Sequence, residues 1–137
     1  MRVVLDTSVL VAAWSSRSGA SFALLRHLRK GDFEIAVSVP LVLEYEAVLQ
    51  RHVRPPLTSL DVEAFIDYLC GVATRQEIFF LWRPLLRDPQ DDMVVEVAVA
   101  AECDAIVTHN VRDFGPATRF GLQVLTPAAT LLTLTGR

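Results

Sequence analysis

The sequence predicts an α/β fold, organised as a single three-layer α/β/α domain around a mostly parallel sheet of four to five strands. Short apolar runs rich in β-branched residues alternate along the chain with longer segments of helical periodicity. Such alternation favours a parallel sheet with right-handed crossovers and with helices on both faces. The length of 137 residues suits one domain over 1–137, with one core and no linker.

The first strand is expected at 3–5, where a continuous apolar run suits a strand buried on both faces of a sheet. A short helix over 9–14 follows and ends in the turn-rich segment 15–19. The next helix, over 20–30, has an apolar stripe, basic residues in its last turn and a stop at Gly31.

The second strand is expected at 33–37, where the pattern alternates and then becomes apolar. Ser38 is a good N-cap with a proline in the turn that follows, which predicts a helix over 40–51. Another helix is predicted over 58–70, and 77–81 is a short strand candidate.

The last third of the chain begins with a polar turn at 88–92 and a helix over 93–103 that is apolar on nearly every side and is therefore predicted to be buried. A strand is then expected at 105–108, followed by a loop over 109–118 and a final strand at 122–125. A short helix with a proline in its first turn is expected from 126 onward.

The composition narrows the classes of function. A net charge of −3 and a pI near 5.5 argue against a protein that coats nucleic acid through its overall field. The apolar runs, interrupted by Asp6 and Glu96, are too short to span a membrane, and the N-terminus lacks the features of a signal peptide. Cys70 and Cys103 have no zinc-site spacing, so we expect buried thiols and a cytoplasmic location.

Acidic residues recur at positions that a parallel sheet brings to its carboxyl edge. Asp6 follows the first strand, and its neighbours alone fit a helix cap as well as a ligand. Further acids lie on the helix after the second strand, at the head of the buried helix and after a later strand: Glu44 or Glu46, Asp91 and Asp92, and Asp113. Gathered carboxylates repel one another unless cations neutralise them, and hard oxygen ligands select Mg²⁺ or Mn²⁺.

The ordered segments Leu5-Asp6-Thr7, Leu43-Glu44-Tyr45, Asp88-Pro89-Gln90-Asp91-Asp92 and Ile106 to Phe114 resemble the PIN-domain nucleases, and most of all the VapC-like toxins of bacterial toxin–antitoxin systems. The resemblance covers essentially the whole chain. It implies a PIN-like α/β/α sandwich and a Mg²⁺- or Mn²⁺-dependent endoribonuclease. That enzyme would cleave single-stranded RNA with a metal-activated water and would be held inactive by a cognate antitoxin.

Residue by residue, the resemblance makes Asp6, Glu44 and Asp91 the catalytic, metal-binding acids. Helical spacing alone leaves Glu44 and Glu46 equivalent, and Asp91 also fits the N-cap of the buried helix. Asn110 stands where many family members have an aspartate, so the charge of the site is reduced there. Asp113 is the candidate to supply the missing carboxylate, with a loop-forming role as its alternative.

Other residues have supporting roles in this interpretation. The hydroxyls of Thr7 and Thr108 are expected to bind acids, metal water or nearby backbone, and Ser8 keeps a polar group beside Asp6. The candidate contacts to RNA phosphates are arginines expected in loops: Arg17, Arg83, Arg87 and Arg112.

Two alternative functions remain open from the sequence. A magnesium-dependent phosphatase of the haloacid-dehalogenase type also has an aspartate after its first strand, but it normally has a second one where this chain has Ser8. Asn110 favours a degenerate, non-catalytic interaction module with the PIN fold.

Apolar side chains such as Trp14, Phe22 and Trp82 fit the core, the surface of a homodimer or a groove for the antitoxin.

Overall fold

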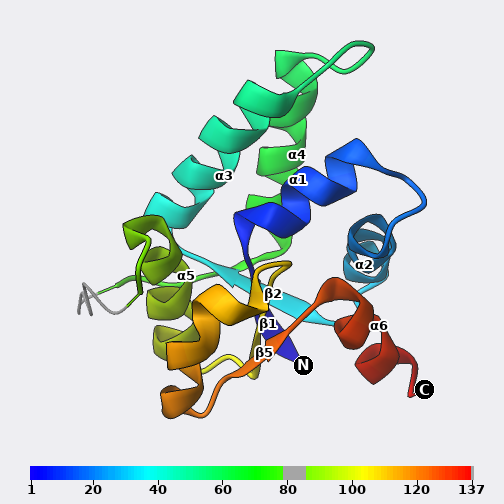
Figure 1. The fold of residues 1–137 in the computed structure, drawn as a ribbon. Coiled ribbons are helices and arrows are strands. Elements are labelled where there is room, and N and C mark those ends of the chain that lie inside the picture. Colours follow the sequence, from blue (N-terminus) through cyan, green and yellow to red (C-terminus); the bar gives the residue numbers. More distant parts are fainter. Residues whose placement is uncertain (79–85, 137) are drawn as a thin grey trace.

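Five parallel strands form the central sheet of the computed structural model, which describes residues 1–78 and 86–136 (Figure 1). In spatial order they are β3 (Thr74–Arg75), β2 (Glu34–Val37), β1 (Arg2–Leu5), β4 (Ala105–Val107) and β5 (Gln123–Leu125). All four pairings between neighbouring strands are parallel. The predicted sheet is therefore confirmed, with five strands.

The order of the strands places a topological switch point beside β1. Val3 is opposite Ile35 of β2 on one side and opposite Ala105 of β4 on the other. The chain moves outward from β1 to β3 and then crosses back to β4, so the connections leaving the adjacent strands β1 and β4 diverge. In open α/β sheets, ligands bind in the crevice that forms at the carboxyl ends of two such strands.

Helices cover both faces of the sheet. Six α-helices and one 3₁₀-helix lie within the described residues: α1 (Thr7–Ser15), α2 (Ala20–Arg29), α3 (Val39–His52), α4 (Ser59–Val72), α5 (Pro89–Ala100), η1 (Val111–Phe120) and α6 (Pro127–Thr135). Helices α2 and α6 lie on one side of the sheet, with α5 and η1 on the other (Figure 1). None of the helices described here is long and apolar enough to cross a membrane.

Local signals fix where several helices begin, as predicted. The Ser38 hydroxyl accepts a hydrogen bond from the Leu41 amide at the start of α3, and Thr58 forms a capping box with Asp61 at the start of α4. The Thr126 hydroxyl caps α6 in the same way. Residues 94–98 of α5 are all buried, as was predicted for a helix that is apolar on nearly every side.

The structure corrects three predicted elements. β3 lies at 74–75 rather than at 77–81, where residues 79–81 fall outside the described part. The expected loop at 109–118 is largely the helix η1, whose buried Phe114 and Ala117 have the three-residue spacing of a 3₁₀-helix. Helix α5 starts four residues earlier than predicted.

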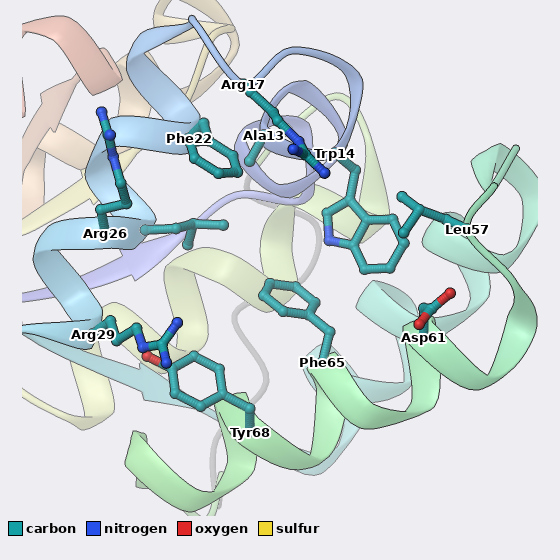
Figure 2. Close-up of a pocket in the computed structure, with 11 residues that line it drawn as sticks. Ala13, Trp14, Arg17, Phe22, Arg26, Arg29, Leu57, Asp61, Phe65 and Tyr68 are labelled. Carbon is teal, nitrogen blue, oxygen red and sulfur yellow. The ribbon is translucent and has the colours of Figure 1, made fainter. Parts of the chain in front are cut away.

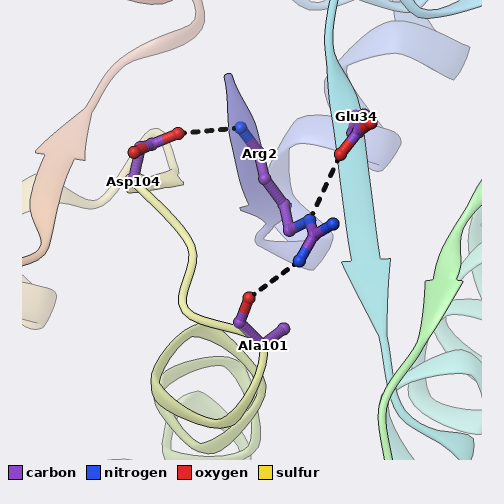
Figure 3. Close-up of polar contacts among 4 residues, drawn as sticks. All are labelled: Arg2, Glu34, Ala101 and Asp104. Carbon is purple, nitrogen blue, oxygen red and sulfur yellow. Dashed lines mark hydrogen bonds and ion pairs between the residues drawn. The ribbon is translucent and has the colours of Figure 1, made fainter.

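Arg2 closes the amino edge of the sheet (Figure 3). Its guanidinium contacts the Glu34 carboxylate at 3.3 Å and donates to the Ala101 carbonyl at 3.1 Å. Its backbone amide donates to Oδ2 of Asp104 at 2.9 Å. The amino edge is thus held by the ion pair and the hydrogen bonds of Arg2.

Both cysteines are free thiols. Cys103 is buried, whereas Cys70 is only partly buried.

Candidate active site at the carboxyl edge of the sheet

Asp6 lies directly after β1, at the switch point, and is only 6% exposed. Its backbone occupies the N-cap position of α1, but its carboxylate makes no capping hydrogen bond. Instead, Oδ2 accepts hydrogen bonds from the hydroxyls of Ser8 and Thr108, each at 2.7 Å. The cap interpretation is therefore wrong for the side chain of Asp6, which is aimed by hydroxyl groups from α1 and from the end of β4.

Tyr45 holds the backbone just before Asp6. It is fully buried in α3, and its hydroxyl donates a hydrogen bond to the Leu5 carbonyl. Burial, and to a lesser degree the charge of Asp6, raises the pKa of Tyr45 well above its ordinary value. The phenol is therefore a neutral donor. The sequence singled out Tyr45 only as part of the segment Leu43-Glu44-Tyr45 and gave its hydroxyl no role, because its partner is 40 residues away.

Asp91 lies in the first turn of α5, and the pKa of its carboxyl is raised to about 7. Burial is the largest cause, followed by the charges of Asp6, Asp88, Asp113 and Asp92. The charges of Asp6 and Asp113 therefore act on the carboxyl of Asp91, although Asp6 follows β1, Asp113 lies in η1 and Asp91 lies in α5. The N-cap alternative is wrong for Asp91, since Asp88 caps α5 by accepting from the Gln90 amide at 2.9 Å.

Glu44 reaches the head of α5 from α3. Its Oε2 accepts a hydrogen bond from the Gln90 side chain at 3.3 Å, one residue before Asp91. Glu44 is not among the groups that raise the pKa of Asp91. Glu46, on the same helix, makes no hydrogen bond or ion pair with any described residue. The contact with α5 therefore distinguishes Glu44 from Glu46, which helical spacing alone did not.

Asp92 is buried, with 1% of its surface exposed, and Oδ1 accepts a hydrogen bond from the Leu86 amide at 2.9 Å. Asp92 is therefore buried rather than solvated. The hydrogen bond from the Leu86 amide to the buried Asp92 carboxylate stabilises the segment that precedes α5.

The turn after β4 contributes its backbone to the site. The Asn110 amide donates to the Thr108 hydroxyl at 2.9 Å, and the Asp113 amide donates to the Asn110 carbonyl at 3.0 Å. The side chains of Asn110 and Asp113 are exposed. Thr7 begins α1, and its hydroxyl makes no hydrogen bond with a described residue, whereas Ser8, which was predicted to keep a polar group beside Asp6, donates to the Asp6 carboxylate.

The predicted RNA-binding arginines that the structure describes form no ion pair with these acids. Arg17, Arg87 and Arg112 are exposed, and Arg83 lies outside the described residues. Within 1–78 and 86–136 the ion pairs are Arg2 with Glu34 and His27 with Asp32, both away from the carboxyl edge. The described hydrogen-bond donors to Asp6 and Glu44 are hydroxyl and amide groups.

The donor set suits a hard divalent cation, but its side chains are not gathered around a point. Carboxylate, amide and hydroxyl oxygens are the ligands that Mg²⁺ prefers, and the raised pKa of Asp91 reflects burial and a smaller contribution from repulsion that a cation would relieve. Among the described residues, however, no three acidic, histidine or cysteine side chains converge closely enough to hold a metal ion. The chemistry of the residues therefore fits the metal, although the described side chains do not form a group of three such ligands.

A separate groove lies between α1, α2 and α4 and has a volume of about 630 Å³ (Figure 2). Aromatic rings form its floor: the Trp14 and Phe65 ring centres are 5.5 Å apart, and Phe65 stacks on Tyr68. Three arginines line it as well: Arg17, Arg26 and Arg29. Trp14 and Phe22 are therefore partly exposed in this groove, and Trp82 lies outside the described residues.

Solved structures share this architecture at low sequence identity. A chain of VapBC2 from Rickettsia felis, solved bound to a DNA fragment from its promoter, matches with a TM-score of 0.63 and 17% identity, covering 92% of this chain and 98% of that one. VapBC-1 from nontypeable Haemophilus influenzae matches with a TM-score of 0.60 and 16% identity, covering 93% of this chain and 99% of that one. A chain of FitAB, solved bound to the IR36 DNA fragment, matches with a TM-score of 0.63 and 13% identity, covering 91% of this chain and 94% of that one. These matches establish a common fold.

No match was found among curated proteins. The family model described as "PIN domain" matches residues 2–112, which include β1, β4 and every acid singled out here except Asp113. The chain belongs to the PIN domain family.

Proposed function

We propose that the protein is a metal-dependent endoribonuclease that cleaves single-stranded RNA, and that it is the toxin of a type II toxin–antitoxin pair acting in the cytoplasm. The observation that carries this proposal is the group of acids at the switch point. There, two hydroxyls orient the carboxylate of Asp6, and the pKa of Asp91 is raised to about 7 by burial and, to a lesser degree, by its acidic neighbours. PIN domains are generally nucleases, which supports a phosphodiester hydrolase.

In this proposal Asp6, Glu44 and Asp91 hold the cation, with Asn110 and Asp113 as further oxygen donors. A bound Mg²⁺ or Mn²⁺ would supply an activated water and neutralise charge on the scissile phosphate. Ser8 and Thr108 keep Oδ2 of Asp6 in place, which leaves Oδ1 without a described hydrogen-bond donor and available to a ligand. Asp91 binds a cation when it has lost its proton, so it contributes best above about pH 7.

The RNA would be bound through phosphate contacts. Arg87 precedes the cap of α5, and Arg112 is adjacent to Asp113, so both flank the proposed cation site along the chain. Arg17 and Arg83 are the remaining candidates. Phosphate contacts of this kind weaken steeply as the salt concentration rises.

Cleavage of a labelled single-stranded RNA by purified protein with Mg²⁺ or Mn²⁺ tests the proposal. Asp6→Asn and Glu44→Gln should each lower the rate by at least about 100-fold, because each removes a charge that holds the cation. Glu46→Gln is the matched control, since Glu46 is on the same helix without the contact to α5, and it should cleave like the wild type. Full activity of Asp6→Asn would refute the assignment.

The same preparation separates the alternatives. Absence of both saturable Mn²⁺ binding and RNA cleavage would favour the non-catalytic module suggested by Asn110. Hydrolysis of a small phosphate monoester in place of RNA would favour the phosphatase.

We also propose a cognate antitoxin and a homodimer as partners. The groove of Figure 2 suits an antitoxin segment with apolar anchors and flanking carboxylates, because aromatic rings line its floor and three arginines lie around it. Co-purification with the product of the adjacent gene tests this part. Arg26→Glu should weaken the complex and Arg119→Glu, on η1, should not, while light scattering of the protein alone tests the dimer.

A further inference from the structure

The orientation of Asp6 depends on a turn that is outside its own element. The Ser8 and Thr108 hydroxyls both donate to Oδ2 of Asp6. Each hydroxyl in turn accepts a backbone amide: His109 N donates to Ser8 Oγ at 3.2 Å, and Asn110 N donates to Thr108 Oγ1 at 2.9 Å. Because each hydroxyl oxygen receives an amide, its single proton remains directed at the carboxylate.

The two amides belong to consecutive residues of one turn, so the position of that turn sets both hydroxyls at once. A displacement of the turn would weaken both hydrogen bonds to Asp6 together. The residue between Thr108 and Asn110 is His109, and its side chain provides a contact from this turn to a different layer of the molecule.

The His109 imidazole is bound to α2. Its Nε2 lies 2.8 Å from Oγ of Ser21, which is in the first turn of that helix and is only 2% exposed. Most of His109 is at the surface, so this contact joins a surface turn to a buried hydroxyl 88 residues away in the sequence.

We propose that Ser21 and His109 form a positioning pair for Asp6: their hydrogen bond fixes the turn whose amides direct the Ser8 and Thr108 hydroxyls at the carboxylate. Neither residue contacts the reacting atoms. The inference rests on the proposed nuclease function for its effect on rate, but its structural content is independent of that function.

The kinetic test compares Ser21→Ala, His109→Ala and the double variant on single-stranded RNA at saturating Mg²⁺. Each single variant should lower kcat by about 10- to 100-fold, the usual cost of losing a residue that orients a metal ligand, with a smaller change in KM. The double variant should lose no more than the worse single one, since both act through one contact. Losses that multiply would overturn the pair.

Two further variants separate positioning from general destabilisation. His109→Gln places an amide nitrogen near the position of Nε2 and should restore most of the activity lost in His109→Ala. His27→Ala removes a 2.7 Å hydrogen bond to Asp32 from the same helix as Ser21, away from the site, and should leave kcat unchanged. Equal losses in His109→Gln and His109→Ala would contradict the inference.

Hydrogen exchange distinguishes failure of this inference from failure of the proposed function. In the wild type the amides of His109 and Asn110 should be protected, and in Ser21→Ala both should exchange at least about tenfold faster while the amides of β1 keep their protection. Unchanged exchange in Ser21→Ala would overturn the positioning pair even if the protein cleaves RNA. Faster exchange in a protein that cleaves no RNA would retain the pair and refute the nuclease.

Discussion

The two ends of β1 meet opposite electrostatic conditions. At the amino edge, Arg2 is surrounded by acceptors: the Glu34 carboxylate and the Ala101 carbonyl on its guanidinium, and Asp104 on its backbone amide (Figure 3). At the carboxyl edge, Asp6 is buried with two hydroxyl donors and no described cation, and it raises the pKa of Asp91. One strand therefore links an end that has an ion pair with an end where neighbouring carboxylates raise the pKa of Asp91.

The contrast separates what folding requires from what a ligand requires. Paired charges at the surface stabilise a fold weakly but at no cost in repulsion. Gathered carboxylates reduce stability unless something binds them, and strongly shifted pKa values are typical of functional sites for that reason. The carboxyl edge is thus the end of the sheet that a cation would stabilise.

Loss of the Tyr45 hydroxyl is the largest stability change that we expect from the two ends. Tyr45→Phe leaves the buried Leu5 carbonyl without this donor and should lower the free energy of unfolding by about 1–3 kcal/mol. Urea denaturation with an unchanged m-value would measure it.

Tyr68→Phe is the matched control for that change. The Tyr68 hydroxyl is buried, and among the described residues it has no hydrogen-bond partner, so its removal should cost almost nothing. Equal losses in the two variants would mean that the contact to Leu5 does not stabilise the carboxyl edge.

A pH dependence is expected from Asp91. Its pKa in the folded protein, about 7, exceeds the ordinary value of 3.8, so the folded state binds the proton more tightly than the unfolded state does. The resulting stabilisation is complete below about pH 4 and is lost as the pH rises through 7. Since Asp91 is only partly buried, screening reduces the loss to the order of 1–2 kcal/mol.

Thermal melts in EDTA between pH 5 and pH 8 measure this effect. Asp91→Asn should flatten the decline, whereas Asp67→Asn, on an exposed position of α4, should keep it. Added Mn²⁺ should restore stability to the wild type at pH 8 and not to Asp91→Asn. If the stability of Asp91→Asn declined with pH as steeply as that of the wild type, Asp91 would not be its cause. The pH dependence would then not distinguish the carboxyl edge from the amino edge.

The fold could be predicted from sequence because its signals are local. Apolar runs marked β1, β2, β4 and β5, and caps such as Ser38 marked helix starts. β3 was misplaced because Thr74 and Arg75 are not apolar, and they form a strand only by pairing with Ala36 and Val37. A contact with a distant strand, rather than local preference, determines that element.

The site could be predicted only as a set of candidate residues. Asp6 and Thr108 were both identified, but their hydrogen bond joins residues 102 positions apart and depends on β1 lying beside β4. Ser8 was predicted only to keep a polar group beside Asp6, and no pattern indicated the hydrogen bond of Tyr45, since the folded backbone sets the partners of both hydroxyls. The sequence shows which side chains are suited to the chemistry, and the topology determines which of them meet.

The smallest expected effect concerns Arg2 and tests whether the two ends are independent. Arg2→Gln removes an exposed ion pair and one hydrogen bond, so it should lower the free energy of unfolding by about 1 kcal/mol or less, and by less still at high salt. The contact of the Arg2 amide with Asp104 is made by the backbone and should persist. Because β1 separates Arg2 from Asp6, Mn²⁺ affinity and RNA cleavage should stay at wild-type levels. A change in Mn²⁺ affinity of about tenfold, equivalent to roughly 1.4 kcal/mol, would mean that β1 couples its two ends and that the charges at the amino edge also determine the properties of the site.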